Sequence, residues 1–373
     1  MKNIYRIARF KMDDKKSSEL ESFYNSEIFK QRDKDSYSEY WHQHAKKMKL
    51  KKVKNGFITE GESGWYIPET FLKKNISKIL RLFKSPKNII KKLYFKYLKS
   101  PRYLSPQKAF DAVMNHDIIS DPDISTYRVN HLDLAINYKN IITNANDVNK
   151  HYSSWNDEIP NYHIYMEYYY RNLLIPYIKN IPENIFLEIG AGSGNFANLL
   201  IHDYQPRIYF IVDLPESIVN SFIFLTKKFK NLELILPDRF NNKEDLNQRI
   251  KFSNNNQKVI FLTPWQISYI PSNFITLTSN LHSFQEMKFR QIENYFSEIQ
   301  RISKNDGLFF CSNRVEKIPC SEESFKKESN EKPNIFYNYP WNSKNTKIIQ
   351  EISKIHRLIQ SDNLVIRLER IKK

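Results

Sequence analysis

Three closely spaced glycines mark the part of this sequence that is best suited to binding a small polar ligand. Gly190, Gly192 and Gly194 lie in a stretch that reads as a strand, a tight turn and the start of a helix. Glycine lets the backbone pass close to a ligand, and the first turn of a helix exposes amide donors to it. A dinucleotide fingerprint would need glycine at the position of Asn195. The loop therefore indicates a bound polar group, but it departs from the NAD pattern.

Acidic residues accompany this loop on two strands. Glu188 precedes it, and Asp213 ends the next apolar run about twenty residues beyond the first glycine. A carboxylate at that place can accept hydrogen bonds from both hydroxyls of a ribose. The segment LEIGAGSG also resembles motif I of class I methyltransferases, whose acidic residue before the loop helps to fix the methionine end of S-adenosylmethionine. We therefore expect a nucleotide-type cofactor here; the alternative is a structural turn with an unrelated aspartate.

A histidine follows a later strand, at the edge where open α/β sheets hold their ligands. Methyl transfer to an alcohol requires the hydroxyl to lose its proton, and histidine, with an unperturbed pKa of about 6.5, can accept it at neutral pH. A helix that begins at Ser283 would favour the neutral imidazole further. His282 is therefore the candidate general base. The alternative is a histidine that only makes structural hydrogen bonds.

Glu286 is the second candidate catalytic residue. It lies one helical turn beyond His282 and would face the same side, where it could orient the imidazole. Ser283 and Glu286 also fit a capping box, which explains the glutamate without any part in catalysis. Both interpretations stay open on the sequence alone.

The elements that must position these residues are expected to form a mainly parallel sheet with crossover helices. From residue 184 onward, short β-branched and apolar runs alternate with helical stretches, which is typical of a doubly wound, Rossmann-like α/β domain. The expected buried strands are residues 185–189, 208–212, 259–262, 274–277, 308–311 and 364–368. We assign residues 181–373 to this domain.

The first half of the chain has a different character. Residues 1–100 are assigned to a basic, mainly helical N-terminal arm, irregular or partly mobile up to residue 64, with Tyr40-Trp41-His42 as a candidate aromatic anchor. Residues 101–180 are assigned to a helical cap that closes over the acceptor and ends in a long tyrosine-rich helix. Every charged side chain of residues 71–102 is basic, so this segment could lie on an anionic membrane surface. Ordinary helices with a solvated lysine face are the alternative.

Composition bounds the class of protein. The 373 residues are 40% hydrophobic and 27% charged, which is enough apolar material for a folded core and argues against wholesale disorder. The two cysteines are too few for a disulfide framework or a four-cysteine zinc site, so free thiols are expected. No apolar run is long enough to span a bilayer, so we expect a cytoplasmic protein, peripheral at most to the inner face of the membrane. The net charge of +17 indicates an anionic partner or a generally lysine-rich surface.

Several segments resemble a bacterial family of sugar O-methyltransferases. They are LEIGAGSG, VDLPES, FLTPWQ, NLHSFQEM, the SNR after the fifth expected strand and YPW near the C-terminus. The resemblance covers about half of the chain, residues 186–371, and implies a class I fold that uses S-adenosylmethionine to methylate a sugar hydroxyl in a surface-glycan or related saccharide pathway. The stretch around His282 is also similar to the Leu-His-Asp-Trp stretch of small-molecule O-methyltransferases, whose histidine is the base. Here Ser283 and Phe284 replace the Asp and the Trp.

The resemblance implies a role for each candidate residue. The residues expected to contact the cofactor are Glu188, Gly190, Ala191, Gly192, Gly194, Asp213, Leu214, Pro264, Trp265 and Asn280. Among them Trp265 is a candidate for stacking on the adenine, or else a plain core tryptophan. No adjacent acidic pair follows the fourth expected strand, so a metal-free mechanism is expected. The expected acceptor is a saccharide or a nucleotide-linked sugar.

Two other functions compete with this one. An RNA methyltransferase would use the basic N-terminal region. However, the Asn/Asp-Pro-Pro-aromatic tetrapeptide of amino-methylating enzymes is absent, and Cys320 lies beyond the fifth expected strand, where a cytosine-attacking thiol is not expected. A non-catalytic, membrane-associated component of a glycan-assembly complex would bind the cofactor without turnover. We prefer the sugar O-methyltransferase interpretation.

Overall fold

The computed structural model describes residues 12–31, 41, 49–53, 56–60, 162–179, 183–251, 257–319, 332–352 and 364–373. The chain divides into two compact units. The first consists of Met1–Tyr66, Pro176–Ser353 and Asp362–Lys373, and the second of Ile67–Ile175 and Lys354–Ser361. The basic segment 71–102, most of the expected cap and Cys320 lie outside the described residues. All of the predicted site residues belong to the first unit.

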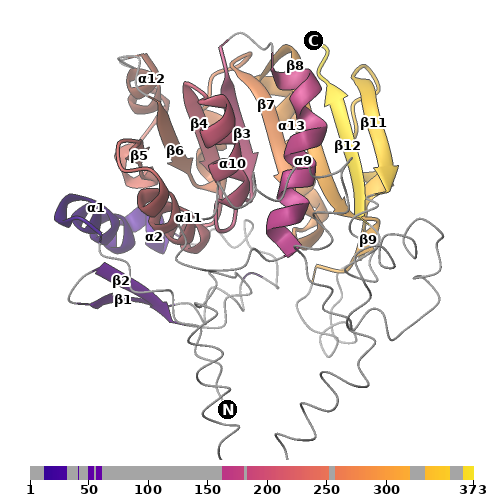
Figure 1. Ribbon diagram of the computed structural model, residues 1–373. Helices are drawn as coiled ribbons and strands as arrows, with labels where there is room; N and C mark the ends of the chain where they lie inside the picture. The colour runs from indigo at the N-terminus through magenta and orange to yellow at the C-terminus, as the bar shows by residue number, and fades with distance from the viewer. Residues whose placement is uncertain are drawn as a thin grey trace, which may run out of the picture. The chain divides into compact units, whose positions relative to one another are not determined.

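An eight-stranded sheet forms the centre of the first unit (Figure 1). Its strands are β3 (Ile185–Ile189), β4 (Ile208–Val212), β5 (Glu233–Ile235), β6 (Lys258–Leu262), β7 (Ile275–Leu281), β8 (Ser303–Arg314), β11 (Thr346–Ile352) and β12 (Leu364–Arg370). Their order in space is β11-β12-β8-β7-β3-β4-β6-β5. β12 is antiparallel to both of its neighbours, and all the other pairs are parallel. The expected mainly parallel sheet is confirmed, and β3, β4, β6, β7 and β8 therefore end at one common carboxyl edge.

All of the predicted apolar runs form strands of this sheet, and the bounds of β3 and β4 are the predicted ones. These two strands and β6 are buried along their whole length, which explains their continuous apolar sequences. The sequence did not predict β5 or β11. β5 is only three residues long, and the side chains of β11 are exposed or partly exposed, so neither carries a buried apolar run.

In the described part of the chain, the α-helices that connect these strands are α10 (Asn195–Tyr204), α11 (Pro215–Lys228), α12 (Lys243–Lys251) and α13 (Phe289–Ile302). The α13 helix buries one stripe of side chains, namely Ile292, Tyr295, Phe296, Ile299 and Ile302. The Phe296 ring packs edge-on against Trp341, with ring centroids 4.9 Å apart, and against Phe309 of β8 at 5.4 Å. Full burial of a side chain of this size contributes roughly 1.5–3 kcal/mol. These contacts fix α13 on the sheet.

The N-terminal part of the first unit contains two helices that pack against later residues of the same unit. α1 (Asp14–Asn25) starts with Asp13 as its N-cap and buries Leu20 and Phe23 completely, and α2 (Glu27–Lys30) follows it. The Lys16 ammonium donates to Leu234 O (3.4 Å), and the Ser22 hydroxyl donates to the Asp238 carboxylate (3.2 Å). The expectation of an irregular arm was therefore wrong for this stretch. A short hairpin follows, formed by β1 (Lys49–Val53) and β2 (Gly56–Glu60).

The α9 helix (Tyr162–Ile178) confirms the predicted tyrosine-rich helix that precedes the sheet. It contains Pro176 close to its C-terminal end. Within the described part of the chain, no helix combines the length and the apolar character needed to cross a bilayer.

Replacement of Phe23 by Ala tests the packing of α1. Because the ring is fully buried, its loss should lower the free energy of unfolding by roughly 3–5 kcal/mol. Chemical denaturation measures this change, and Lys15→Ala on the exposed side of the same helix is the control. A Phe23→Ala protein as stable as the Lys15→Ala protein would show that α1 is not docked.

Candidate active site

The glycine loop joins the carboxyl end of β3 to the first turn of α10. Gly190, Gly192 and Gly194 have φ angles of 74°, 57° and 81°, in the left-handed region that glycine adopts without strain. The Gly190 amide donates to Val212 O (2.8 Å), and the Gly194 amide donates to Ala191 O (2.9 Å). The predicted strand, turn and helix start are confirmed, and the loop is tied to the end of β4.

Gly190 also permits a close approach between two loops. A Cβ atom at this position would overlap the side chain of Ser283. The Ser283 hydroxyl donates to Ile189 O (3.2 Å), which is 94 positions away in the sequence. Because Ser283 directly follows His282, the glycine loop and the loop of the candidate base touch at the carboxyl edge.

Asp213 follows β4 and braces the glycine loop. Its Oδ2 accepts a hydrogen bond from the Gly192 amide (2.8 Å), and its Oδ1 accepts one from the Leu214 amide (2.7 Å). Burial raises the pKa of this carboxyl group to about 6, while the hydrogen bonds from both amides act in the opposite direction. The structure thus gives Asp213 a part in shaping the loop, and its contact with a ribose stays a prediction.

Glu188 is 2% exposed, and its Oε2 accepts a hydrogen bond from the Tyr209 hydroxyl (2.8 Å). Burial raises the pKa of this carboxyl group to about 8; the bond from Tyr209 opposes the shift, and the charge of Asp213 adds to it. Two buried carboxylates that repel each other are costly when ionised, and a positive charge between them would offset that cost. The acidic pair therefore fits a cofactor that carries positive charge.

Pro264 and Trp265 lie in η5 (Pro264–Tyr269), the short helix that follows β6. The buried Gln266 side chain holds this turn, because its Oε1 accepts from the Thr263 amide (3.1 Å) and its Nε2 donates to Pro237 O (3.1 Å). The Trp265 Nε1 is buried and has no hydrogen-bond partner among the described residues. Buried donors without an acceptor are rare. The fixed turn after β6 thus carries a buried N–H group for which the described residues offer no acceptor.

Trp41 packs against Leu214, the residue that follows Asp213. The sequence suggested Tyr40-Trp41-His42 as an aromatic anchor; the structure identifies a side chain that Trp41 contacts, and the other two residues lie outside the described ones. The N-terminal segment thus reaches the carboxyl edge beside the predicted ribose site.

His282 directly follows β7 and is partly buried. Its φ angle of 62° is unusual for a residue other than glycine, and such strained positions cluster at functional sites. Its amide donates to Ser312 O of β8 (2.7 Å), which fixes the backbone. The helix expected at Ser283 is only the short 3-10 helix η6 (Phe284–Glu286), and α13 starts later, at Phe289. The predicted effect of a helix dipole on the imidazole therefore loses its structural basis.

The Glu286 carboxylate pairs with Lys317 of β9 (Glu316–Lys317), with an Oε1–Nζ distance of 2.7 Å. The expected capping box is absent, because the Ser283 side chain makes no capping hydrogen bond and binds Asn280 and Ile189 instead. That expectation was wrong, since two strands outside the turn supply the partners. An orienting contact from Glu286 to His282 stays a prediction.

Asn280 is fully buried and uses its whole side chain within the protein. Its Nδ2 donates to Ile189 O (3.0 Å) and to the Ser283 Oγ (2.5 Å). Its Oδ1 accepts from the Asn313 Nδ2 (2.8 Å) and from the Phe284 amide (3.3 Å). The side chain therefore supports the His282 loop, and a direct contact with the cofactor, as predicted, would have to break one of these bonds.

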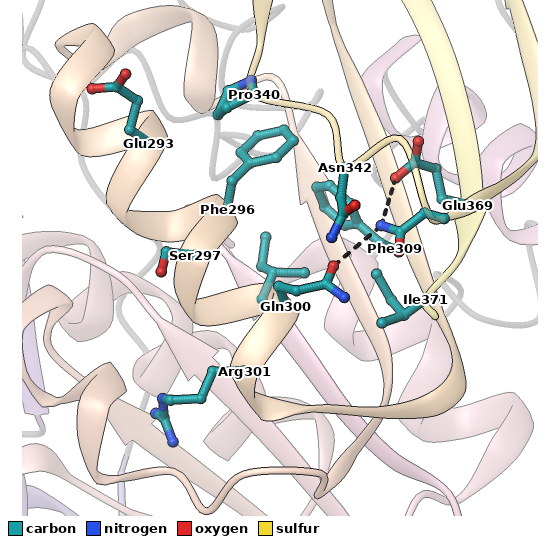
Figure 2. A pocket seen from close by; sticks show the side chains of 12 residues that line it. Glu293, Phe296, Ser297, Gln300, Arg301, Phe309, Pro340, Asn342, Glu369 and Ile371 are labelled. Atoms are coloured by element: carbon teal, nitrogen blue, oxygen red, sulfur yellow. Dashed lines mark hydrogen bonds between the residues drawn. The ribbon is translucent and has the colours of Figure 1, made fainter. Parts of the chain in front are cut away.

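A cavity of about 580 Å³ lies between α13 and residues 340–345, and none of the predicted site residues lines it. In Figure 2, dashed lines mark hydrogen bonds that reach Gln300 and Glu369, whereas Glu293, Ser297 and Arg301 are drawn without a bond to another lining residue. Asn345 donates to the Gln300 Oε1 (3.3 Å) and to the Glu369 Oε2 (3.2 Å). This cavity and the candidate active site are thus separate features. No group of three or more His, Cys, Asp or Glu side chains in the described ranges is arranged to hold a metal ion.

The order and direction of the strands, with the antiparallel β12 between β8 and β11, define a Rossmann-like class I methyltransferase fold. The predicted fold class is confirmed. No protein-family model and no curated protein matches the chain.

Solved structures with a similar fold include three proteins at low identity. Phosphoethanolamine N-methyltransferase 2 of Haemonchus contortus, in complex with phosphomonomethylethanolamine and S-adenosylhomocysteine, is 13% identical, with 55% of this chain and 53% of that one covered and a TM-score of 0.32. The PH0226 protein of Pyrococcus horikoshii is 16% identical, with coverages of 54% and 87% and a TM-score of 0.32. A geranyl diphosphate methyltransferase, in complex with GPP and sinefungin, is 8% identical, with coverages of 56% and 81% and a TM-score of 0.33.

The raised pKa of Glu188 predicts a pH-dependent stability of the ligand-free protein. Between its ordinary pKa of 4.5 and about 8, the folded state holds a proton that the unfolded state has released, so stability falls as the pH rises through this window. The pKa of Asp213 is raised only to about 6, so the stability that its bound proton contributes is lost mostly below about pH 6. From pH 6 to pH 8 the Glu188 group should therefore cost roughly 2–3 kcal/mol.

Urea denaturation at several pH values measures this loss. Glu188→Gln keeps the shape of the side chain and removes the titration, so its stability should fall less over the same range. Parallel pH profiles for the two proteins would contradict the assignment.

Proposed function

We propose that this chain is an S-adenosylmethionine-dependent methyltransferase that methylates a hydroxyl group of a saccharide. The observation that carries the proposal is the contact between Gly190 and Ser283. It brings the loop of a candidate base against the loop of a candidate cofactor site, on a class I methyltransferase fold.

The residues around the glycine loop fit the proposed cofactor. Glu188 and Asp213 are buried acids whose ionisation burial disfavours, and the cofactor carries a sulfonium and an ammonium group. The Trp265 N–H is a donor without a partner among the described side chains, and a purine offers acceptor nitrogens. Asp213 already receives hydrogen bonds from two backbone amides and from the Ser217 side chain, and an ionised carboxylate has about four acceptor positions, so about one remains for a ribose hydroxyl.

The chain's own residues would then perform three tasks. The glycine loop and Asp213 orient the nucleoside, and Glu188 neutralises positive charge inside the protein. His282 accepts the proton of the acceptor hydroxyl on an imidazole nitrogen as the new bond forms. S-adenosylmethionine, when bound, would supply the methyl group from its sulfonium, and cleavage of the sulfur–methyl bond would leave neutral S-adenosylhomocysteine.

The choice of a saccharide acceptor rests on the family resemblance of the segments around His282, Arg314 and Trp341. The net charge of +17 supports an acceptor that carries phosphate or carboxylate, such as a nucleotide-linked sugar. The same charge favours RNA as the second candidate acceptor. Incubation with radiolabelled cofactor and separate pools of nucleotide-sugars, acidic oligosaccharides and RNA distinguishes them, because label in the RNA pool alone would reject the saccharide.

Asp213→Ala should weaken the affinity for S-adenosylhomocysteine at least tenfold, because it removes the ribose acceptor and frees two loop amides. Calorimetric titration measures the affinity. Asp245→Ala, a change at a capping aspartate of α12, is the control and should leave it unchanged. Equal affinities for the two variants would argue against a cofactor beside Asp213.

His282→Asn and His282→Gly test the proposed base. Asparagine and glycine tolerate the left-handed backbone found at this position, so both variants should keep the loop intact. Turnover should fall by about 10²–10⁴-fold, while the affinity for S-adenosylhomocysteine stays within about threefold. His202→Asn, at a half-exposed histidine of α10, is the matched control. A His282 variant with the turnover of the control would reject the base.

A further inference from the structure

We propose that Asn313 is a positioning residue, which holds the His282 loop against the glycine loop through a buried amide network with Asn280 and Gln285. The segments NLHSFQEM and SNR, which carry the family resemblance, contain Gln285 and Asn313, but the sequence alone predicts no role for either residue. The inference rests on the proposed function for its catalytic consequence, and on the geometry alone for the conformation of the loop.

Asn313 lies on β8 and is fully buried beside the end of β7. Its Nδ2 donates to the Asn280 Oδ1 (2.8 Å), and its Oδ1 accepts from the Gln285 amide (3.1 Å). The Asn313 side chain therefore bonds to residues on both sides of His282, namely Asn280 before it and Gln285 after it. The conformation of His282 is determined from its two flanks as well as through its own amide.

The network continues from Asn280 to the cofactor side. The Asn280 Nδ2 donates to Ile189 O, the last residue of β3, and to the Ser283 Oγ. Ser283 is the residue against which a Cβ at position 190 would collide. A displacement of Asn280 would therefore shift both the base loop and its contact with Gly190.

A second set of bonds closes the network on the other side of the loop. The Gln285 Oε1 accepts a hydrogen bond from the Arg314 amide of β8 (2.7 Å). The Gln285 side chain therefore binds the backbone of β8, while the Asn313 side chain of β8 binds the backbone of Gln285. Asn334 donates to Met287 O (2.7 Å) and lies within 3.4 Å of two further loop carbonyl oxygens. Side-chain hydrogen bonds from Asn313 and Asn334 therefore fix the position of the short η6 helix.

This arrangement exceeds what packing alone requires. Buried amides stabilise only when every donor and acceptor is matched, and apolar side chains of similar size would fill the same space without that condition. Matched amide networks specify one loop conformation instead, and catalysis requires a base held within about half an ångström. The network is concentrated at the end of β7 where the candidate base lies.

Asn313→Ala and Thr276→Val form a matched pair for the test. Thr276 is also buried and bridges β7 to β3, with its Oγ1 bonded to the backbone of Ile185 (3.0 and 2.9 Å), but it lies at the opposite end of β7. Both variants lose a buried polar bridge, so both should lower the melting temperature. Only Asn313→Ala should reduce kcat, by about 10–100-fold, with KM and the affinity for S-adenosylhomocysteine within about threefold.

Amide hydrogen exchange of residues 282–285 provides a readout that needs no activity. Exchange should be at least tenfold faster in Asn313→Ala than in the wild type and unchanged in Thr276→Val. If wild-type protein binds no S-adenosylhomocysteine, the proposed function fails while this measurement still decides the positioning role. Equal exchange in the two variants, or an unchanged kcat in Asn313→Ala, overturns the inference.

Discussion

The close approach of two loops at Gly190 is the constraint on which the rest of the site depends. A side chain at this position would push away Ser283, and with it the turn that carries His282. The neighbouring Gly192 is held by Asp213, so the first two glycines of the loop each serve a different partner. The parallel β3, β4 and β7 bring these partners together because all three strands end at the same edge. The fold thus supplies the proximity, and glycine removes the steric obstacle to it.

Electrostatics distinguish this edge from an ordinary buried turn. Glu188 and Asp213 are both taken out of water, and the raised pKa of each records the cost of ionising it there. Folding alone does not explain two buried acids, because apolar side chains of similar size could fill the same space at a lower free-energy cost. They are explained if a positively charged ligand occupies the space, since the same burial then strengthens the attraction. The buried acids would then lower the stability of the ligand-free protein and raise its affinity for a positively charged ligand.

The sequence predicted the central strands well, because burial on both faces leaves a continuous apolar run at β3, β4 and β6. It failed where partners come from distant segments. The local pattern from Ser283 to Glu286 suggested a capping box. In the structure the Ser283 hydroxyl bonds to Ile189 and Asn280, and the Glu286 carboxylate bonds to Lys317. Asn313 lies in the SNR segment, but the sequence predicted no role for it, because one buried amide has no periodicity. The sequence did not predict the α1 helix, because it lies in a polar stretch. Two features of the sequence could have predicted it: Asp13 as an N-cap and the helical spacing of Leu20 and Phe23.

The central claim is that a positively charged adenosine cofactor lies between the glycine loop, Glu188 and Asp213, with His282 facing its reactive end. A crystal structure of the protein grown with S-adenosylhomocysteine tests this most directly. The account predicts density for the ligand at the carboxyl edge, with its ribose at Asp213 and its amino-acid portion toward Glu188. A ligand bound elsewhere, or a nicotinamide dinucleotide in the same place, would contradict it.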